Sequence, residues 1–144
     1  MPMILGDPLQ TFARAYQEIC AGDDPWVALG NFLNDWFVYE IKRRAELIAE
    51  QPAQLENPTL EQQRWSSFIA ASTEYLCQQH DIRCPTWVYD DLYRLEMPWY
   101  DAVVVTKNVQ IWLEETTPEP FRRRNIYCGD RLYLDKEEVI TRSA

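Results

Sequence analysis

Apolar side chains recur at three- and four-residue intervals near the start of the chain, which is the spacing of one face of an α-helix. They are Leu9, Phe12, Ala13, Tyr16 and Ile19. Asp7-Pro8 precedes them, and Asp can accept hydrogen bonds from the free amides of a first turn while Pro fits the first helical position. Gly22 is placed to end the helix. The pattern predicts an amphipathic helix between Asp7 and Gly22.

A second and longer stripe of helical period starts at Asp24-Pro25 and runs almost to Gln51-Pro52. Its apolar members are Trp26, Leu29, Phe32, Leu33, Trp36, Phe37, Ile41, Ala45 and Ile48. The centre of the stripe is too apolar to be solvated, so we expect the core helix here. Aromatic and β-branched residues at Val38-Tyr39-Glu40 lower helix propensity. One long helix, or two helices with a bend, would both satisfy the pattern.

Thr59-Leu60-Glu61-Gln62 matches a capping box, in which a hydroxyl and an amide satisfy two otherwise free backbone donors. The residues at helical spacing that follow predict a third helix, and they are Trp65, Phe68, Ile69, Ser72, Tyr75 and Leu76. This helix should end around Gln79-His80. Cys84-Pro85 then predicts extended backbone, because the residue before a proline disfavours the helical region.

The stretch from Trp87 to Tyr100 is rich in aromatic residues and has room for one short helix, about Asp90 to Leu95. Its tip, Pro98-Trp99-Tyr100, cannot continue that helix. A further helix is expected from about Lys107 to Glu115, with Val109, Trp112 and Leu113 on its buried side. The segment Ala102-Val103-Val104-Val105 fits either the first turn of this helix or a short strand.

Thr117-Pro118 repeats the cap-then-proline start and predicts a short helix that holds Phe121. Ile126-Tyr127-Cys128 and Arg131-Leu132-Tyr133-Leu134 flank Gly129-Asp130, which suits a tight hairpin turn. We therefore expect a mainly α fold, a helical bundle of about five helices with a small C-terminal β-hairpin. A single domain would cover residues 1–144, with a helical body over 7–116, the short helix, arginine stretch and hairpin over 117–134, and a tail over 135–144.

Composition and charge narrow the class of protein. The chain has only 4 Gly among its 144 residues, too few for a turn-rich β fold. Its formal net charge of -9 argues against broad nucleic-acid binding, which needs a surplus of Lys and Arg, and fits a basic protein partner. No apolar run approaches the roughly 18 residues that span a bilayer, and the first residues lack a basic segment followed by an apolar one. We expect a cytoplasmic protein.

Few residues in the chain carry reactive chemistry. His80 is the only histidine, which excludes a histidine-rich metal site. Cys77 stands three residues before it, but a Cys–His nucleophile also needs an orienting group and an oxyanion hole, for which the sequence gives no sign. The four cysteines are irregularly spaced without a C-x-x-C pair, and we expect them to be free thiols: Cys20, Cys77, Cys84 and Cys128.

Cofactor and metal sites are not expected. The four glycines are too scattered to form a phosphate-binding loop. The adjacent acids Asp90-Asp91, Glu114-Glu115 and Glu137-Glu138 point in different directions on a helix and are expected to be solvated. Asp101 has aromatic neighbours but is expected to be an ordinary loop acid.

Three consecutive guanidinium groups, Arg122, Arg123 and Arg124, stand out in an acidic chain because they stay charged and need carboxylates or phosphates. One interpretation is an internal network with helix carboxylates such as Glu114, Glu115 or Glu119, and the other is contact with a partner. The aromatic residues that precede them have the same two interpretations: they pack in the core, or they form a binding hot spot. We predict that the partner-binding residues are Trp87, Trp99, Tyr100, Arg122, Arg123 and Arg124.

The motifs Pro85-x-Trp87, Leu95-x-x-Pro98-Trp99-Tyr100 and Pro118-x-x-Phe121-Arg122-Arg123-Arg124-Asn125-Ile126-Tyr127 together resemble the C-terminal pattern of a loosely defined group of small bacterial proteins. The pattern covers roughly half of the chain. Members of that group resemble companions of toxin genes, including nucleotidyltransferase-like ones, at toxin–antitoxin loci. This chain departs from the group in its longer N-terminal section with an extra helix.

The sequence thus leads to one main functional hypothesis and two alternatives. The main hypothesis is a non-catalytic protein-binding module, an antitoxin-like or accessory partner of a bacterial toxin or defence enzyme. The first alternative is a small regulator that contacts nucleic acid through Arg122–Arg124 and Lys42–Arg44, although Glu40 and Glu46 favour a solvated face for the second group. The second alternative is an enzyme that uses Cys77 or Cys84 with His80, which requires a thiol of low pKa.

Overall fold

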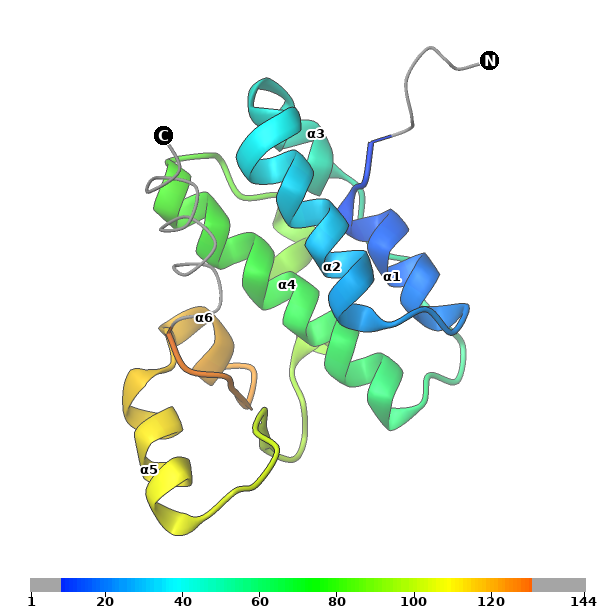
Figure 1. Ribbon diagram of the computed structural model, residues 1–144. Helices are drawn as coiled ribbons and strands as arrows, with labels where there is room; N and C mark the ends of the chain where they lie inside the picture. Colours follow the sequence, from blue (N-terminus) through cyan, green and yellow to red (C-terminus); the bar gives the residue numbers. More distant parts are fainter. Residues whose placement is uncertain (1–8, 131–144) are drawn as a thin grey trace. The chain divides into compact units, whose positions relative to one another are not determined.

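The computed structural model describes residues 9–130, and within them the fold is mainly helical, with six α-helices and one pair of short strands (Figure 1). The prediction of a mainly α fold is confirmed. The chain divides into two compact units, with the boundary between Pro58 and Thr59, and each is described by itself. That the whole chain forms a single domain stays a prediction.

The first unit begins with helix α1 (Phe12–Cys20). Thr11 caps it, since its hydroxyl oxygen accepts a hydrogen bond from the Arg14 amide at 3.0 Å. The predicted start at Asp7-Pro8 is wrong, because residues 9–11 are not helical; Asp7 and Pro8 themselves lie outside the described residues. Gly22 follows the helix with a φ of 107°, a backbone conformation that side chains disfavour.

Helix α2 (Pro25–Asn34) starts as predicted, with the Asp24 carboxylate accepting from the Trp26 amide at 2.8 Å. The helix then continues through a π-helical segment η1 (Asp35–Tyr39) and breaks at Glu40, which leaves the helical region at φ -129° and ψ 40°. A 3₁₀ turn η2 (Ile41–Arg43) and helix α3 (Arg44–Ala49) follow. Of the two predicted forms of this stripe, the one with a bend is observed.

Aromatic packing holds the first unit together. The Phe12 and Phe32 rings are stacked with centroids 3.6 Å apart, and Trp36 packs beside Phe32 at 5.7 Å. Arg43 pairs with Glu46 at 2.9 Å on the exposed surface, as the predicted solvated face requires. The apolar stripes of α1, α2 and η1 therefore bury most of their predicted members. The stripe members Trp26, Ile41 and Ala45 are exposed instead.

The second unit is built on helix α4 (Leu60–His80), the longest helix in the described residues. The predicted capping box is present: the Thr59 hydroxyl oxygen accepts from the Gln62 amide, and the Gln62 side-chain oxygen accepts from the Thr59 amide. The helix ends at His80, as predicted, with Asp81 in the left-handed conformation at φ 53°. This turn returns the chain toward the last part of the helix.

Short elements fill the rest of the second unit. The single helix expected near Asp90 to Leu95 is instead two 3₁₀ turns, η3 (Thr86–Tyr89) and η4 (Asp91–Tyr93). Helices α5 (Lys107–Thr116) and α6 (Glu119–Arg122) match their predicted positions. The segment 102–105 forms neither a helical turn nor a strand, and the side chains of its three valines are exposed.

The strand pairing corrects the predicted hairpin. Strand β2 (Ile126–Tyr127) pairs in parallel with β1 (Trp99–Tyr100), with Trp99 opposite Ile126 and Tyr100 opposite Tyr127. The antiparallel partner expected for Ile126-Tyr127-Cys128 was Arg131–Leu134, which lies outside the described residues. A parallel partner must come from a distant part of the chain, and the Pro98-Trp99-Tyr100 step supplies it.

Candidate functional site

A buried carboxylate on α4 is the centre of the candidate site. Glu74 has a relative exposure of 5%, although it carries a charge that is costly to remove from water. It lies among the many small and apolar residues that line the buried part of α4, such as Ala70 and Ala71. A buried carboxylate of this kind requires cations and hydrogen-bond donors close by.

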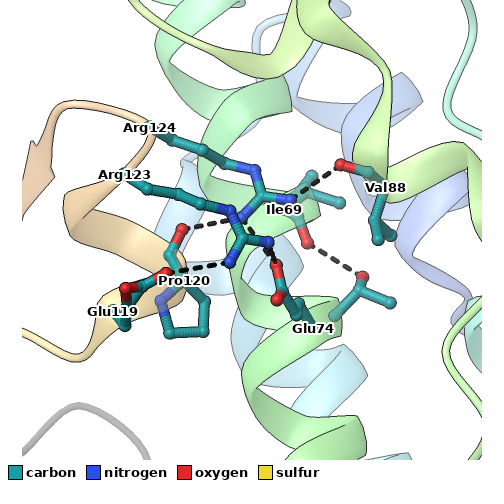
Figure 2. A network of polar contacts seen from close by, with 8 residues as sticks. Ile69, Glu74, Val88, Glu119, Pro120, Arg123 and Arg124 are labelled. Atoms are coloured by element: carbon teal, nitrogen blue, oxygen red, sulfur yellow. Dashed lines mark hydrogen bonds and ion pairs between the residues drawn. The ribbon is translucent and has the colours of Figure 1, made fainter.

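Arg124 supplies the first of these cations. Its Nη1 donates to Glu74 Oε1 at 2.9 Å and to the Pro120 carbonyl oxygen at 2.7 Å, and its Nη2 donates to the Val88 carbonyl oxygen at 2.7 Å. The residue is only 4% exposed. Figure 2 shows how this one guanidinium group joins α4, the 3₁₀ turn η3 at Val88 and helix α6.

Arg123 supplies the second cation and connects the network to the surface. Its Nη2 donates to the same Glu74 oxygen, and its Nη1 donates to Glu119 Oε1 at 3.0 Å (Figure 2). Its guanidinium carbon lies 5.9 Å from the centre of the Tyr89 ring, within the range of a cation–π contact. The guanidinium group of Arg123 therefore takes part in the buried network and also lies beside the exposed Tyr89 ring.

The network sets the charge states of its members. Burial raises the pKa of Glu74, but the hydrogen bonds from Arg123 and Arg124 outweigh it, so the pKa of this carboxyl lies below its ordinary value. Burial lowers the pKa of Arg124, while the hydrogen bond to Glu74 opposes that shift; an arginine remains protonated in either case. Glu74 consequently stays a carboxylate between two charged guanidinium groups at neutral pH.

The backbone around Arg124 is tied to the segment before β1. The Leu95 amide donates to the Arg124 carbonyl oxygen at 3.1 Å, and the Trp99 amide donates to the Asn125 carbonyl oxygen at 2.8 Å. Asn125 is left-handed at φ 64°, and its side-chain amide donates to the Leu95 carbonyl oxygen. These bonds place the arginine stretch against the aromatic segment, which the sequence did not reveal.

The arginine stretch contains one buried residue, Arg124, and two exposed residues, Arg122 and Arg123, of which Arg123 also reaches the buried Glu74. Arg123 and Arg124 form the internal network that was one of the two interpretations, and Glu119 is one of the predicted carboxylates. Glu74 was missed, since nothing in the local sequence marks one acid of α4 as a partner for residues some 50 positions away. Glu114 accepts instead from the Tyr100 hydroxyl, and the Arg122 side chain is exposed.

The three predicted aromatic contact residues are all partly packed. Trp87 meets Tyr93 edge to face at 5.6 Å, and Trp99 meets Trp65 in the same way at 5.2 Å. Tyr100 stacks on Tyr127 at 4.8 Å. Each keeps an intermediate exposure, so the structure gives them a packing role, and their role as contacts for a partner stays a prediction.

A small pocket opens beside the network. Its volume is 160 Å³, and its lining consists of Val88, Tyr89, Asp90, Asp91, Tyr93, Arg94, Arg123 and Arg124. The Asp90 carboxylate accepts from the Leu92 amide at 3.0 Å and so fixes the turn η4. The Arg94 side chain is exposed and makes no hydrogen bond or ion pair with residues 9–130. The pocket thus combines the fixed side chains of Arg123 and Arg124 with exposed side chains at Tyr89 and Arg94.

Cys77 and Cys84 belong to the same unit. Cys77 on α4 is buried at 3% exposure, and Cys84 is half-buried and packs against the cluster of Ala70, Val88 and Tyr93. The neighbouring Cys77 thiol lowers the pKa of Cys84 to about 7; the Tyr89 hydroxyl and the charge of Arg124 act in the same direction, while burial and the charge of Glu74 oppose them. The hypothesis of an enzyme that uses Cys77 or Cys84 with His80 stays a prediction.

Within residues 9–130, no group of three or more Cys, His, Asp and Glu side chains is arranged to hold a metal ion. The helices of that range are also too short or too polar to cross a membrane. Comparison of the chain with family models, with curated proteins and with solved structures gave no match.

Proposed function

We propose that this chain is a non-catalytic protein-binding module and that the pocket beside Arg123 receives one side chain of its partner. The supporting observation is the combination of a rim with exposed Tyr89 and Arg94 and a floor fixed by the Glu74–Arg123–Arg124 network. Binding hot spots have this form, because an aromatic or Arg anchor on a rigid support loses little conformational freedom.

The size of the pocket favours a side chain over a substrate. Its 160 Å³ is well below the roughly 300–1,000 Å³ of typical small-molecule sites. Arginine and aspartate side chains both line it, so it matches a polar side chain better than an apolar one. The pocket is thus suited to recognition within a larger protein–protein contact.

The charge of the chain favours a basic partner. A formal net charge of -9 attracts a positively charged surface and speeds the encounter with it. An enzyme that binds nucleic acid or nucleotides has such a surface, and blocking it would inhibit the enzyme. We therefore propose an antitoxin-like or accessory role toward a bacterial toxin or defence enzyme.

Co-expression of the chain with the product of a neighbouring toxin-like gene, followed by affinity capture, tests this proposal. We expect a stoichiometric complex that survives gel filtration. Tyr89→Ala and Arg94→Ala should each weaken it at least tenfold, since both side chains stand at the rim of the pocket. Tyr39→Ala is the matched control, because Tyr39 is also an exposed tyrosine, at 73% against 56% for Tyr89, and belongs to the first unit.

Two results would contradict the proposal. One is the absence of a complex with the neighbouring product, and the other is a complex that Tyr89→Ala and Tyr39→Ala weaken to the same degree. Thermal unfolding of each variant establishes that the fold is intact, which exposed positions should preserve.

The nucleic-acid alternative has less support. It depends on Arg122–Arg124 and Lys42–Arg44, and three of these six cations already pair with carboxylates: Arg123 and Arg124 with Glu74, and Arg43 with Glu46. Counterion release from the few remaining cations gives a small salt dependence, whereas the protein complex proposed above depends on specific contacts at the pocket.

A further inference from the structure

The turn η4 carries two opposite charges that do not pair with each other. The Arg94 amide donates to the Asp91 carbonyl oxygen at 3.2 Å, so the two residues stand at the start and the end of one 3₁₀ turn. Side chains three positions apart lie on the same side of such a turn. Both side chains are exposed, and neither has an ion-pair or hydrogen-bond partner among residues 9–130. The Asp91 carboxylate and the Arg94 guanidinium group are therefore available to another chain.

The pocket beside this turn favours a cation once its internal ion pairs are taken into account. The charged side chains that line it are Asp90, Asp91, Arg94, Arg123 and Arg124. The charges of Arg123 and Arg124 are balanced by Glu74 and Glu119, with which they pair. Apart from Arg94, which is exposed, the two aspartates are the charges that remain without an opposite partner. A guest with a positive charge would complement them.

The size and the lining of the pocket fit a guanidinium group. That group has four non-hydrogen atoms, each about the size of a water molecule, which takes roughly 30 Å³ in the liquid, so the 160 Å³ volume can hold it. The Tyr89 ring lines the same pocket and is 56% exposed, and guanidinium groups stack on such rings. Asp90 Oδ1 accepts from the Leu92 amide, which holds this carboxylate in place. An arginine side chain from another chain would therefore find a ring and fixed acceptors here.

We propose that two copies of this chain form a symmetric dimer, in which Arg94 of each copy enters the pocket of the other and pairs with its Asp91. A two-fold axis makes such a contact self-complementary, because the pair that Arg94 forms with the second copy is repeated by Asp91 in return. Each unpaired charge of the turn then gains an opposite charge from the same surface. Leu92 stands between the two residues and is 45% exposed, so the contact also removes apolar surface from water.

The net charge of the chain opposes self-association but does not prevent this contact. At physiological ionic strength, charges more than roughly 8 Å apart are largely screened, whereas partly buried pairs are screened much less. Repulsion between two copies of net charge -9 is thus weakened more than the Asp91–Arg94 pairs. The dimer contact covers Tyr89 and Arg94, so it would compete with the partner proposed above. The dimer itself does not rest on that proposed function, since it needs no other protein.

The experiment is analytical ultracentrifugation of the full chain alone, at physiological salt and over a range of concentrations. We expect a reversible equilibrium between the 17.1 kDa chain and a species of twice that mass. Arg94→Asp and Asp91→Arg should each weaken the dimer about tenfold or more, because each places like charges opposite one another. Arg122→Asp is the matched control: it changes the net charge as Arg94→Asp does, at an exposed arginine that does not line the pocket, and should leave the equilibrium unchanged.

A mixture of the two variants tests the pairing directly. Arg94→Asp has two negative charges at these positions and Asp91→Arg has two positive ones, so together they should form a heterodimer about as stable as the unsubstituted dimer. All three substituted positions are exposed, and thermal unfolding checks that the fold is intact. The proposal would be overturned by an unsubstituted chain that is monomeric at every concentration, by a dimer that Arg94→Asp and Arg122→Asp weaken equally, or by a mixture that stays monomeric. Each of these results would leave the partner complex to its own test with the neighbouring product.

Discussion

Aromatic rings stack in the interior of the unit formed by residues 9–58, whereas residues 59–130 enclose the Glu74 carboxylate and the Arg124 guanidinium group. In the first unit, Phe12, Phe32 and Trp36 make the core, and the Arg43–Glu46 pair is exposed. In the second unit, Glu74 and Arg124 are 5% and 4% exposed. Apolar packing tolerates many rearrangements, but a buried ion pair stabilises only one arrangement of the segments that carry it.

The buried charges also connect distant segments of the second unit. The internal charges of the second unit hold together helix α4, the loop at Val88 and helix α6, and the pocket opens where these segments meet. The first unit has no comparable buried ion pair among its described residues. Buried charges are costly, so we expect them where the positions of the surrounding segments must be fixed, as around this pocket.

The largest loss of unfolding free energy should come from removing the Glu74 carboxylate. Glu74→Ala leaves Arg124 buried without its counter-charge, which costs about 4 kcal/mol of unfolding free energy. Urea denaturation gives the global value, and hydrogen exchange should show the loss in residues 59–130 rather than in 9–58. Glu119→Ala is the control, because its ion pair with Arg123 is exposed and should contribute about 0.5 kcal/mol. Equal effects of the two substitutions would contradict the comparison.

A smaller effect is expected from a cavity in the first unit. Leu47→Ala removes a fully buried side chain on α3 and should cost about 3 kcal/mol. Leu55→Ala, at a position that is 37% exposed, should change the unfolding free energy by less than about 0.5 kcal/mol. Here hydrogen exchange should accelerate in residues 9–58. If residues 59–130 lost protection equally, the two units would not unfold separately.

The smallest of the three effects is a difference in acid sensitivity. The pKa of Glu74 is lower in the folded state than in the unfolded chain, so its stabilising contribution is complete above the unfolded value near ~4.3. The contribution is lost as the pH falls through the lowered folded value. We therefore expect hydrogen-exchange protection in residues 59–130 to weaken below about pH 4. Glu74→Gln should remove that part of the pH dependence, and an unchanged profile in this variant would contradict the assignment.

Local signals in the sequence predicted the helices well. Asp24 and Thr59 mark helix starts because a capping bond joins residues only two or three positions apart. The start of α1 was misplaced since Asp7-Pro8 and Thr11 offer competing caps, and the spacing of apolar residues fits both. Where two local signals compete, tertiary packing decides between them.

The candidate site was harder to predict because its contacts are not local. Gly129-Asp130 resembles a hairpin turn, yet Ile126–Tyr127 pairs in parallel with Trp99–Tyr100, a partner that no turn signal can indicate. The pairing of Arg124 with Glu74 likewise joins residues that are far apart in the sequence. The sequence predicted that the arginine side chains need acidic partners, but it did not identify Glu74 as one of them.

Glu74 and Arg124 are 50 positions apart in the sequence, so their ion pair can form only late in synthesis of the chain. Residues 9–58 can complete their packing once α3 has left the ribosome, since all the contacts described for them lie within that stretch. Helix α4 emerges with an ionised carboxylate that must stay hydrated until residues some 50 positions later arrive. A ribosome that pauses before Arg123 would thus display a finished N-terminal unit beside a helix still exposed to chaperones.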